Sequence, residues 1–342
     1  MVDIAWGEYA LGTKQHRVVQ VPEIRDSKGK KVTVDSLCEI GGRVCGGLTD
    51  GSILLFDPST LTQQGHLRCE GNVGGVWCMT ACGDLLVSGH GRMDHCLRVW
   101  NLTTGGCREL KGHTDGVSCL ASWDKFLVSG SKDKSLKVWE IGRNDCLDTI
   151  NEHTSTISAV VVWQGQVISG SDNNKISVYD AVARKRKDSI DVGERTGKIF
   201  ALVLHHATLL SASEDGTIGV WALGTFEPLW KVKVSDHVTS AQYCFCLAGS
   251  GSKVLGGGWS KTNSKTLNTG FLLVLDAESK TCEHMVLTES PIYKLLSLQG
   301  VVWGRLEHQR DFDREFDGQG KVVVWGNPVA EQQAGREAGR SS

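Results

Sequence analysis

The sequence predicts an all-β protein, a seven-bladed β-propeller of four-stranded antiparallel blades. The first observation behind this prediction is that seven short apolar strands each end in an aromatic or bulky apolar residue. These closing residues are Phe56, Trp100, Trp139, Tyr179, Trp221, Leu275 and Trp325. The second observation is their spacing, because successive closing residues are 44, 39, 40, 42, 54 and 50 positions apart. A repeat of about 40–45 residues is typical of propeller blades.

The clearest repeat runs from residue 112 to residue 150. It contains an inner strand from Val117, a second strand from Phe126, a third strand ending at Trp139 and an outer strand from Cys146. Short strands separated by turn residues are expected in each of the other repeats as well. Their second strands begin at Val44, Leu86, Val167, Leu209, Val254 and Val301.

The two ends of the chain predict how the ring closes. The last repeat has no fourth strand after Trp325, whereas an extra strand, Arg17–Val21, precedes the first repeat. We expect this N-terminal strand to complete the last blade, which would leave no free sheet edge at the junction. The predicted organisation is therefore a lead-in at 1–16, the propeller at 17–327 and a disordered polar tail at 328–342.

Composition excludes several classes of protein. The net charge is −2 and the isoelectric point is near 6.6, so no basic field is present to hold nucleic acid. We find no apolar run long enough to cross a bilayer and no secretory signal at the N-terminus. We expect a cytoplasmic protein, with nuclear entry possible, that acts without cofactors as a monomeric subunit of a larger assembly.

The cysteine positions argue against disulfides. Cys78 and Cys119 occupy the same place in two repeats, and Cys107, Cys146 and Cys282 each open an outer strand. Equivalent cysteines lie in different blades and point the same way, so we do not expect them to pair. No second ligand pair follows at zinc-site spacing. We expect small buried hydrophobic residues in a reducing compartment, with a redox or metal role as the alternative.

Over residues 17–327 the repeats resemble the WD-repeat family. Gly112-His113, Ser129, Asp133 and Trp139 match the structural tetrad of that family. The resemblance implies a chain of hydrogen bonds from Asp133 to His113, on to Ser129 and then to the Trp139 indole. Other blades depart from the pattern. The departures include Asn72 in place of a histidine, Asn173 and Tyr179 in the fourth blade, and no evident histidine in the fifth.

The same residues could also form a hydrolase triad, but no Gly-x-Ser-x-Gly elbow accompanies them. We therefore predict a structural network and no enzyme activity. The glycine-rich segments 249–252 and 256–258 lack the Gly-Lys-Ser/Thr of a phosphate loop and are interpreted as turn and strand glycines. The pair His205-His206 is assigned to a turn. The basic run Arg184–Lys187 is either a solvated loop of blade four, a nuclear-import signal or a contact for an acidic partner.

In the family, two positions per blade point to the narrow top face. Internal alignment maps these positions to Asp35 and Thr49, Trp77 and Met93, Ser118 and Lys132, Ser158 and Asp172, Phe200 and Glu214, Gln242 and Trp259, and Tyr293 and Arg305. The candidate partner-binding residues are Trp77, Lys132, Phe200, Trp259, Tyr293 and Arg305. Exposed rim aromatics indicate anchors for a partner, unless the channel or neighbouring loops bury them.

Two insertions are expected on the same face, Ser260–Thr269 and Leu306–Asp317, the second of which contains Phe312 and Phe316. Together these features predict a non-catalytic scaffold that binds protein or peptide partners. The alternative function is a substrate receptor of a cullin–RING ubiquitin ligase. Receptors of that kind in this family use arginine clusters, whereas Lys132 and Arg305 are the only cations at the mapped positions. The ligase-adaptor arginine also lies one residue late, at Arg143, and no F-box precedes the ring.

Overall fold

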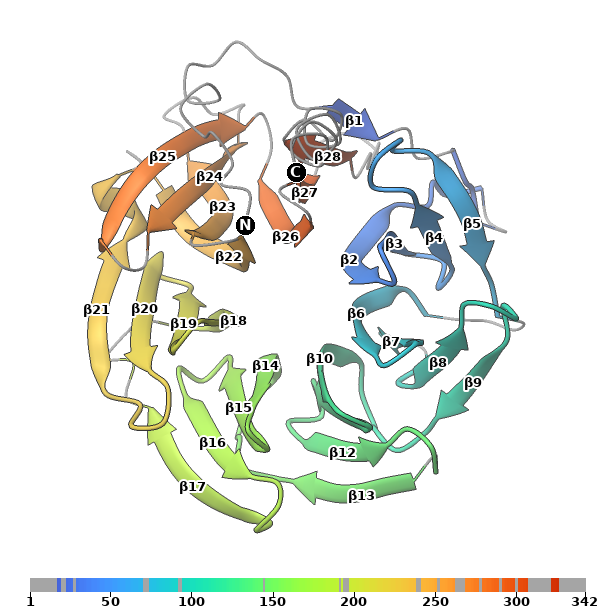
Figure 1. Ribbon diagram of the computed structural model, residues 1–342, viewed down its shortest axis with the longest axis horizontal. Coiled ribbons are helices and arrows are strands. Elements are labelled where there is room, and N and C mark those ends of the chain that lie inside the picture. The colour runs from blue at the N-terminus through green and yellow to red at the C-terminus, as the bar shows by residue number, and fades with distance from the viewer. Residues whose placement is uncertain are drawn as a thin grey trace, which may run out of the picture.

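The computed structural model shown in Figure 1 describes most of the predicted propeller. The residues that it describes are 17–19, 23–26, 29–69, 74–91, 94–143, 145–190, 192, 197–237, 241–250, 253–261, 268–276, 279–288, 291–298, 301–306 and 321–325. The predicted lead-in, the predicted tail, Asn72, Met93, Phe312 and Phe316 lie outside these ranges.

The described strands form seven four-stranded antiparallel sheets. Blade 1 is β2 (Val34–Ile40), β3 (Arg43–Leu48), β4 (Ile53–Phe56) and β5 (Gln63–Leu67), and blade 2 is β6 (Val76–Cys82), β7 (Leu85–His90), β8 (Leu97–Asn101) and β9 (Cys107–Leu110). Blade 3 is β10 (Val117–Trp123), β11 (Phe126–Ser131), β12 (Leu136–Glu140) and β13 (Asp145–Ile150), and blade 4 is β14 (Ile157–Trp163), β15 (Gln166–Ser171), β16 (Ile176–Asp180) and β17 (Lys185–Ile190). Blade 5 is β18 (Ile199–His205), β19 (Thr208–Ser213), β20 (Thr217–Ala222) and β21 (Pro228–Lys233), followed by the short 3₁₀ helix η2 (Val234–Asp236). Blade 6 is β22 (Ala241–Ser250), β23 (Lys253–Lys261), β24 (Asn268–Asp276) and β25 (Thr281–Thr288).

The remaining sheet has the order β1-β28-β27-β26, and we call it blade 7. Its strands are β1 (Arg17–Val19), β26 (Ile292–Leu298), β27 (Val301–Leu306) and β28 (Lys321–Trp325). Arg17 lies opposite Val324 in the antiparallel pair of β1 and β28. Leu296 of β26 packs against the blade 1 core around Val34. The first and last described strands of the chain therefore lie side by side in one sheet (Figure 1).

The sheets are arranged around a central axis, with β2, β6, β10, β14, β18, β22 and β26 innermost (Figure 1). The prediction of an all-β propeller built from four-stranded antiparallel blades is confirmed. Each inner strand shifts register near its beginning, so that one residue has no partner on the second strand. These bulge residues are Asp35, Trp77, Ser118, Ser158, Phe200, Phe245 and Tyr293. We call the end of the ring where they lie the top face. Because a bulge redirects a side chain out of the regular alternation, this pattern defines a ring of positions around the channel.

A glycine in the second strand lets neighbouring blades approach closely. A Cβ added at Gly89 would lie 2.7 Å from Val117 of the next blade, and one added at Gly130 would lie 2.7 Å from Ile157. Blade 5 has Ala212 at this position. In the next blade, the position equivalent to Val117 and Ile157 is occupied by Cys244, which is smaller than a valine or an isoleucine. The recurring glycine therefore reflects how closely the β-branched residue of the next blade must pack.

Hydrogen bonds also join the inner strands of neighbouring blades. The Ser36 hydroxyl donates to the Val76 carbonyl at 2.9 Å, and the Ser118 hydroxyl donates to the Ile157 carbonyl. The Cys78 thiol donates to the Val117 carbonyl at 3.5 Å. Each acceptor belongs to the residue just before a bulge, so one blade satisfies a carbonyl of the next.

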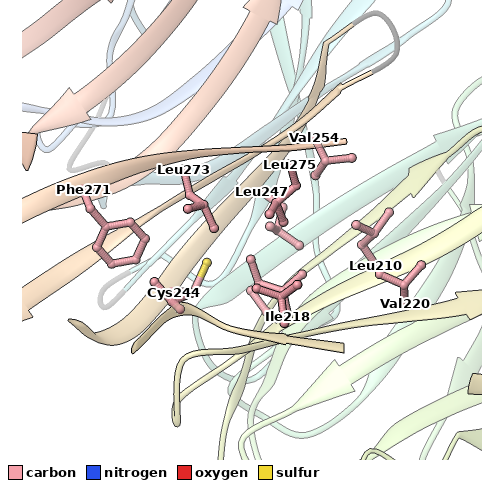
Figure 2. Close-up of a cluster of buried hydrophobic side chains, with 12 residues drawn as sticks. Leu210, Ile218, Val220, Cys244, Leu247, Val254, Phe271, Leu273 and Leu275 are labelled. Carbon is pink, nitrogen blue, oxygen red and sulfur yellow. The ribbon is translucent and has the colours of Figure 1, made fainter. Parts of the chain in front are cut away.

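The apolar core lies between adjacent blades. Figure 2 shows the cluster shared by blades 5 and 6, where Leu210 and Val220 face Leu247 and Val254. Six of the closing residues predicted from the sequence belong to such clusters, and Trp100 and Trp139 are fully buried. Their burial explains why the repeat is readable in the sequence.

Blade 6 is longer than its neighbours. Its strands have 10, 9, 9 and 8 residues, whereas the inner strand of blade 3 has 7 and the second strand has 6. The pair Cys246–Gly257 corresponds to the pair Cys119–Gly130, so the additional residues extend the sheet beyond the top face. Three strand residues add roughly 10 Å.

This register corrects two predictions for blade 6. The register of β22 shifts twice, so that both the mapped Gln242 and Phe245 lack a partner on β23. Phe245 is the equivalent of the bulge residues in the other blades, because it precedes the pair Cys246–Gly257 as Ser118 precedes the pair Cys119–Gly130. The predicted insertion Ser260–Thr269 begins and ends as strand, with Ser260 paired to Thr269. Residues 262–267 of that insertion lie outside the described chain.

The prediction that the cysteines do not pair is wrong for one pair. Cys69, just after β5, and Cys107, the first residue of β9, form a disulfide between the outer regions of blades 1 and 2. Cys69 has no equivalent in the other repeats, so a comparison of equivalent positions could not reveal its partner. Among the described residues, no group of three potential metal ligands comes together, and no helix is long and apolar enough to cross a membrane.

Candidate functional site

The structure brings the four predicted tetrad residues of blade 3 together. His113 Nδ1 lies 2.8 Å from an Asp133 carboxylate oxygen, and His113 Nε2 lies 2.7 Å from Ser129 Oγ. The Trp139 indole N–H donates to Ser129 Oγ at 2.9 Å. Ser129 and Trp139 are fully buried. A hydroxyl held in this way is no accessible nucleophile, which supports the structural interpretation over a hydrolase triad.

Asp133 anchors the network to the turn that follows β11. Burial opposes ionisation of this carboxyl group, but hydrogen bonds from His113, Ser135 and Thr114 hold its pKa well below the usual range. The Thr114 backbone N–H donates at 3.0 Å and the Ser135 hydroxyl at 2.6 Å. Asp133 therefore joins the loop before β10 to the turn between β11 and β12 as an anion.

Removing one partner of this network should destabilise the fold. We expect Trp139→Phe or His113→Ala to lower the free energy of unfolding by roughly 1–3 kcal/mol, because a buried polar group is left unpaired. Urea unfolding followed by tryptophan fluorescence and circular dichroism measures the change. Trp230→Phe, at a partly exposed tryptophan of β21, is the matched control and should cost less. Equal losses for the two Trp→Phe variants would contradict the role assigned to the indole hydrogen bond.

Blade 2 builds an equivalent network from a different histidine. His90, the last residue of β7, places Nε2 2.8 Å from Ser88 Oγ and Nδ1 2.8 Å from the Gly74 carbonyl. The Trp100 indole N–H donates to Ser88 Oγ at 2.8 Å. His90 was not predicted, because in the family pattern the histidine lies in the loop before the inner strand. The available signal was His90 itself, which stands where blades 3 and 4 have Ser131 and Ser171.

Blade 4 keeps only part of the network. His153 Nε2 lies 2.7 Å from Ser169 Oγ, but His153 Nδ1 has no partner among the described residues. Asn173 binds the Thr154 hydroxyl instead, and the Tyr179 hydroxyl donates to Asp148 at 3.0 Å. The two substitutions noted in the sequence therefore leave a buried, incompletely paired histidine.

These two histidines predict a loss of stability in weak acid. Burial lowers the pKa of His90 from its ordinary value of 6.5 to about 4, and burial lowers the pKa of His153 equally far. The unfolded chain therefore binds more protons than the folded chain between these values, so stability is complete above pH 6.5 and falls as the pH approaches 4. The expected loss at pH 5 is about 2 kcal/mol for each histidine.

Thermal unfolding at pH 7, 6 and 5 tests this prediction. The double variant His90→Gln, His153→Gln should start less stable and show a smaller fall in melting temperature between pH 7 and pH 5. Parallel curves for the two proteins would show that other groups control the acid sensitivity.

Three of the predicted top-face residues come together as part of an aromatic wall. We use this name for Phe200, Tyr243, Phe245, Trp259 and Tyr293. The bulge residues of blades 5, 6 and 7 form its row, with ring centroids 5.2 Å apart for Phe200–Phe245 and 4.7 Å apart for Phe245–Tyr293. Tyr243 stacks on Trp259 at 5.2 Å and lies 5.7 Å from Phe245. Tyr243 and Phe245 were not predicted, because the sequence mapped the top-face position of β22 to Gln242, three residues before Phe245.

All five rings of the aromatic wall are partly exposed. Tyr243 and Trp259 form a cross-strand pair in the part of blade 6 that extends beyond the top face. The Trp259 indole N–H is buried and has no hydrogen-bond partner among the described residues. The wall therefore presents aromatic surface on strands whose register fixes the rings, while the Trp259 indole N–H is buried away from that surface.

Trp77 and Lys132 form a second, separate contact between blades 2 and 3. The Lys132 ammonium lies 4.4 Å from the Trp77 ring centroid, which is cation–π geometry. Gly91 and Gly116 border the ring so closely that a Cβ added at either would clash with it. Trp77 is therefore packed against its neighbours while remaining partly exposed.

Arg305 lies in β27 opposite Lys294, at the register of Gly130, rather than in the following turn. The structure describes the backbone of Arg305 but not its side chain. Lys294 is exposed, and its charge favours the thiolates of Cys78, Cys119 and Cys246, although burial dominates and raises the pKa of Cys119 and Cys246 to about 12. Lys294 is thus an exposed cation of the inner strand β26 whose charge acts on thiols of blades 2, 3 and 6.

The basic run Arg184–Lys187 is mostly strand, whereas the sequence predicted a loop. Arg184 occupies a turn with φ of 50°, and Lys185–Lys187 belong to β17, the outer strand of blade 4. All four side chains are exposed, and Arg186 lies 3.7 Å from Glu152. A line of cations on an outer strand protects that edge from pairing with other sheets. His205 is likewise in a strand, β18, while His206 follows in the turn.

Comparisons with known proteins agree with this geometry. The family model WD domain, G-beta repeat matches residues 59–101, 106–140 and 144–180, which fall in blades 1 to 4. The chain is thus a β-propeller that contains WD repeats. Over the matched residues it is similar to the WD40-repeat family.

Curated relatives match only part of the chain. A zinc finger CCCH domain-containing protein 62 of Arabidopsis thaliana is 32% identical over 106 residues, which cover 29% of this chain and 25% of that protein. An uncharacterized WD repeat-containing protein of Schizosaccharomyces pombe is 38% identical over 87 residues, 25% of this chain and 20% of that protein. Mitochondrial division protein 1 of Saccharomyces cerevisiae is 27% identical over 131 residues, 32% of this chain and 18% of that protein. The matched segments span a quarter or less of each of these relatives.

Proposed function

We propose that this protein is a non-catalytic scaffold that binds a protein or peptide partner on its top face, at the aromatic wall. The observation that carries this proposal is the continuous, partly exposed row of rings across blades 5, 6 and 7. Aromatic residues dominate binding energy at protein interfaces, because they bury a large area with little loss of conformational freedom.

Rigidity supports the same proposal. Cross-strand pairing holds Tyr243 against Trp259, and stacking holds Phe245 against Tyr293, so the surface is arranged before a partner arrives. A preorganised surface loses less entropy on binding. The Trp259 indole N–H is buried, so the exposed part of the wall is aromatic surface. We therefore favour a partner segment with apolar side chains for the wall.

The described bulge residues include no arginine, which favours this interpretation over a receptor that reads phosphorylated peptides through an arginine cluster. We propose further that the protein is a cytoplasmic subunit of a larger assembly and that seven blades close into one ring through the seam of β1 and β28. Trp77, Lys132 and Arg305 are retained as secondary contacts on the same face.

Affinity purification with quantitative mass spectrometry tests the proposed surface. The intact chain is compared with Trp259→Ala, Tyr293→Ala and with a control double variant on β17, Arg184→Ala, Arg186→Ala. Loss of the same partner with the first variant only supports the aromatic wall. Loss with the second variant only would move the surface to the basic strand of blade 4 and indicate an acidic partner.

A further inference from the structure

The Cys69–Cys107 disulfide stands apart from every other cysteine in the described chain. Eight of the remaining cysteines are buried, and burial raises the pKa of Cys38, Cys96 and Cys119 to about 12. Such thiols are unreactive, because the thiolate is the nucleophile. Cys69 and Cys107 are both partly exposed, and their Cα atoms lie 6.7 Å apart, within the range that a disulfide spans.

The pairing is specific to one position in the ring. Cys146 in blade 3 and Cys282 in blade 6 occupy the register of Cys107, since each lies opposite the closing residue of its blade. Cys146 forms no disulfide, because the bond needs a cysteine just after the outer strand of the preceding blade. Only Cys69 supplies one among the described residues.

The bond ties blade 2 to blade 1 at the periphery of the ring. Cys69 and Cys107 are 38 positions apart, and the closed segment contains the three inner strands of blade 2, β6, β7 and β8. Both cysteines pack at the margin of the core cluster shared by the two blades, which includes Leu55 and Trp100. Opening the bond removes the cross-link between β9 and the end of blade 1, and with it a restraint on the unfolded chain.

We propose that Cys69 and Cys107 are a site of reversible thiol oxidation that sets the stability of blade 2 according to the redox state around the protein. The co-reactant is a small-molecule disulfide such as oxidised glutathione. One cysteine thiolate attacks a sulfur of that disulfide, forms a mixed disulfide and releases one thiolate of the co-reactant. The second cysteine thiolate then attacks the protein sulfur of the mixed disulfide and releases the other. The protein is oxidised by two electrons, and two thiols of the co-reactant are formed after protonation.

Thiol counting and peptide mapping on the full chain test the site directly. After equilibration with excess oxidised glutathione and denaturation under acid quench, Cys69 and Cys107 should be joined to each other without added glutathione, whereas an exposed thiol such as Cys146 carries glutathione. Reduction with dithiothreitol should restore all twelve thiols. The protease map should contain one linked pair, Cys69 with Cys107. Twelve free thiols after the oxidation step, or a linked pair that includes Cys146 or another cysteine, would overturn the proposal.

Melting temperatures test the consequence. Reduction should lower the melting temperature of the natural chain by several degrees and leave that of Cys107→Ser unchanged. Cys146→Ser, at the equivalent position of blade 3, should respond to reduction like the natural chain. If Cys107→Ser does not fold, the oxidised and reduced natural chains still decide the matter, since equal melting temperatures for both would refute a stabilising role. None of these readouts depends on the proposed binding surface.

Discussion

Deleting residues 1–22 should lower the melting temperature on the order of 10 °C or cause aggregation. The deletion removes β1, which pairs with β28 through Arg17, Val18 and Val19. Without β1, the backbone donors and acceptors of β28 form an exposed sheet edge in blade 7. Exposed edges pair with other chains, so loss of stability and aggregation have the same physical cause.

The matched control is deletion of residues 1–16, which leaves β1 in place. This shorter deletion should melt like the intact chain. Both deletions are compared by differential scanning calorimetry and by size-exclusion chromatography with light scattering. If the two deletions behave alike, the N-terminal strand does not close the ring and the proposed seven-blade seam is wrong.

Replacing Trp259 and Tyr293 together by alanine should produce the largest loss of binding. An aromatic anchor at the centre of an interface contributes about 2–4 kcal/mol on truncation, which corresponds to about 30- to 1000-fold in affinity. The two residues lie at the two ends of the path Trp259–Tyr243–Phe245–Tyr293. Their removal therefore weakens the aromatic wall on both blade 6 and blade 7. Titration of the purified partner by isothermal calorimetry measures the loss once affinity purification has identified it.

Two controls separate binding from folding. Circular dichroism and thermal unfolding establish that the double variant is folded. Trp77→Ala removes an aromatic side chain of blade 2 that is also partly exposed but lies outside the wall, and it should weaken binding much less. Full binding by the Trp259, Tyr293 variant would show that these rings only pack the channel mouth, and the proposed surface would then be abandoned.

The sequence determined the repeat and the residues that close its strands. Trp100 and Trp139 stand out because a closing position must fill the space between two sheets, and few residue types do so. The four tetrad residues of blade 3 could be named in advance for a related reason, since a buried chain of hydrogen bonds requires particular donors and acceptors. Features of this kind can be predicted from the sequence, because the residues that form them lie within one repeat.

Only the tertiary structure decided the register of blade 6, the pairing of Cys69 with Cys107 and the place of His90 in its network. Phe245 and Gln242 are three residues apart in one apolar segment, and alternation alone cannot show where a bulge shifts the register. Cys69 meets Cys107 because two outer strands from different blades come together at the rim, 38 positions apart in the chain. Bulges and contacts between blades depend on how whole sheets pack around the axis, and this packing has no signature within a single repeat.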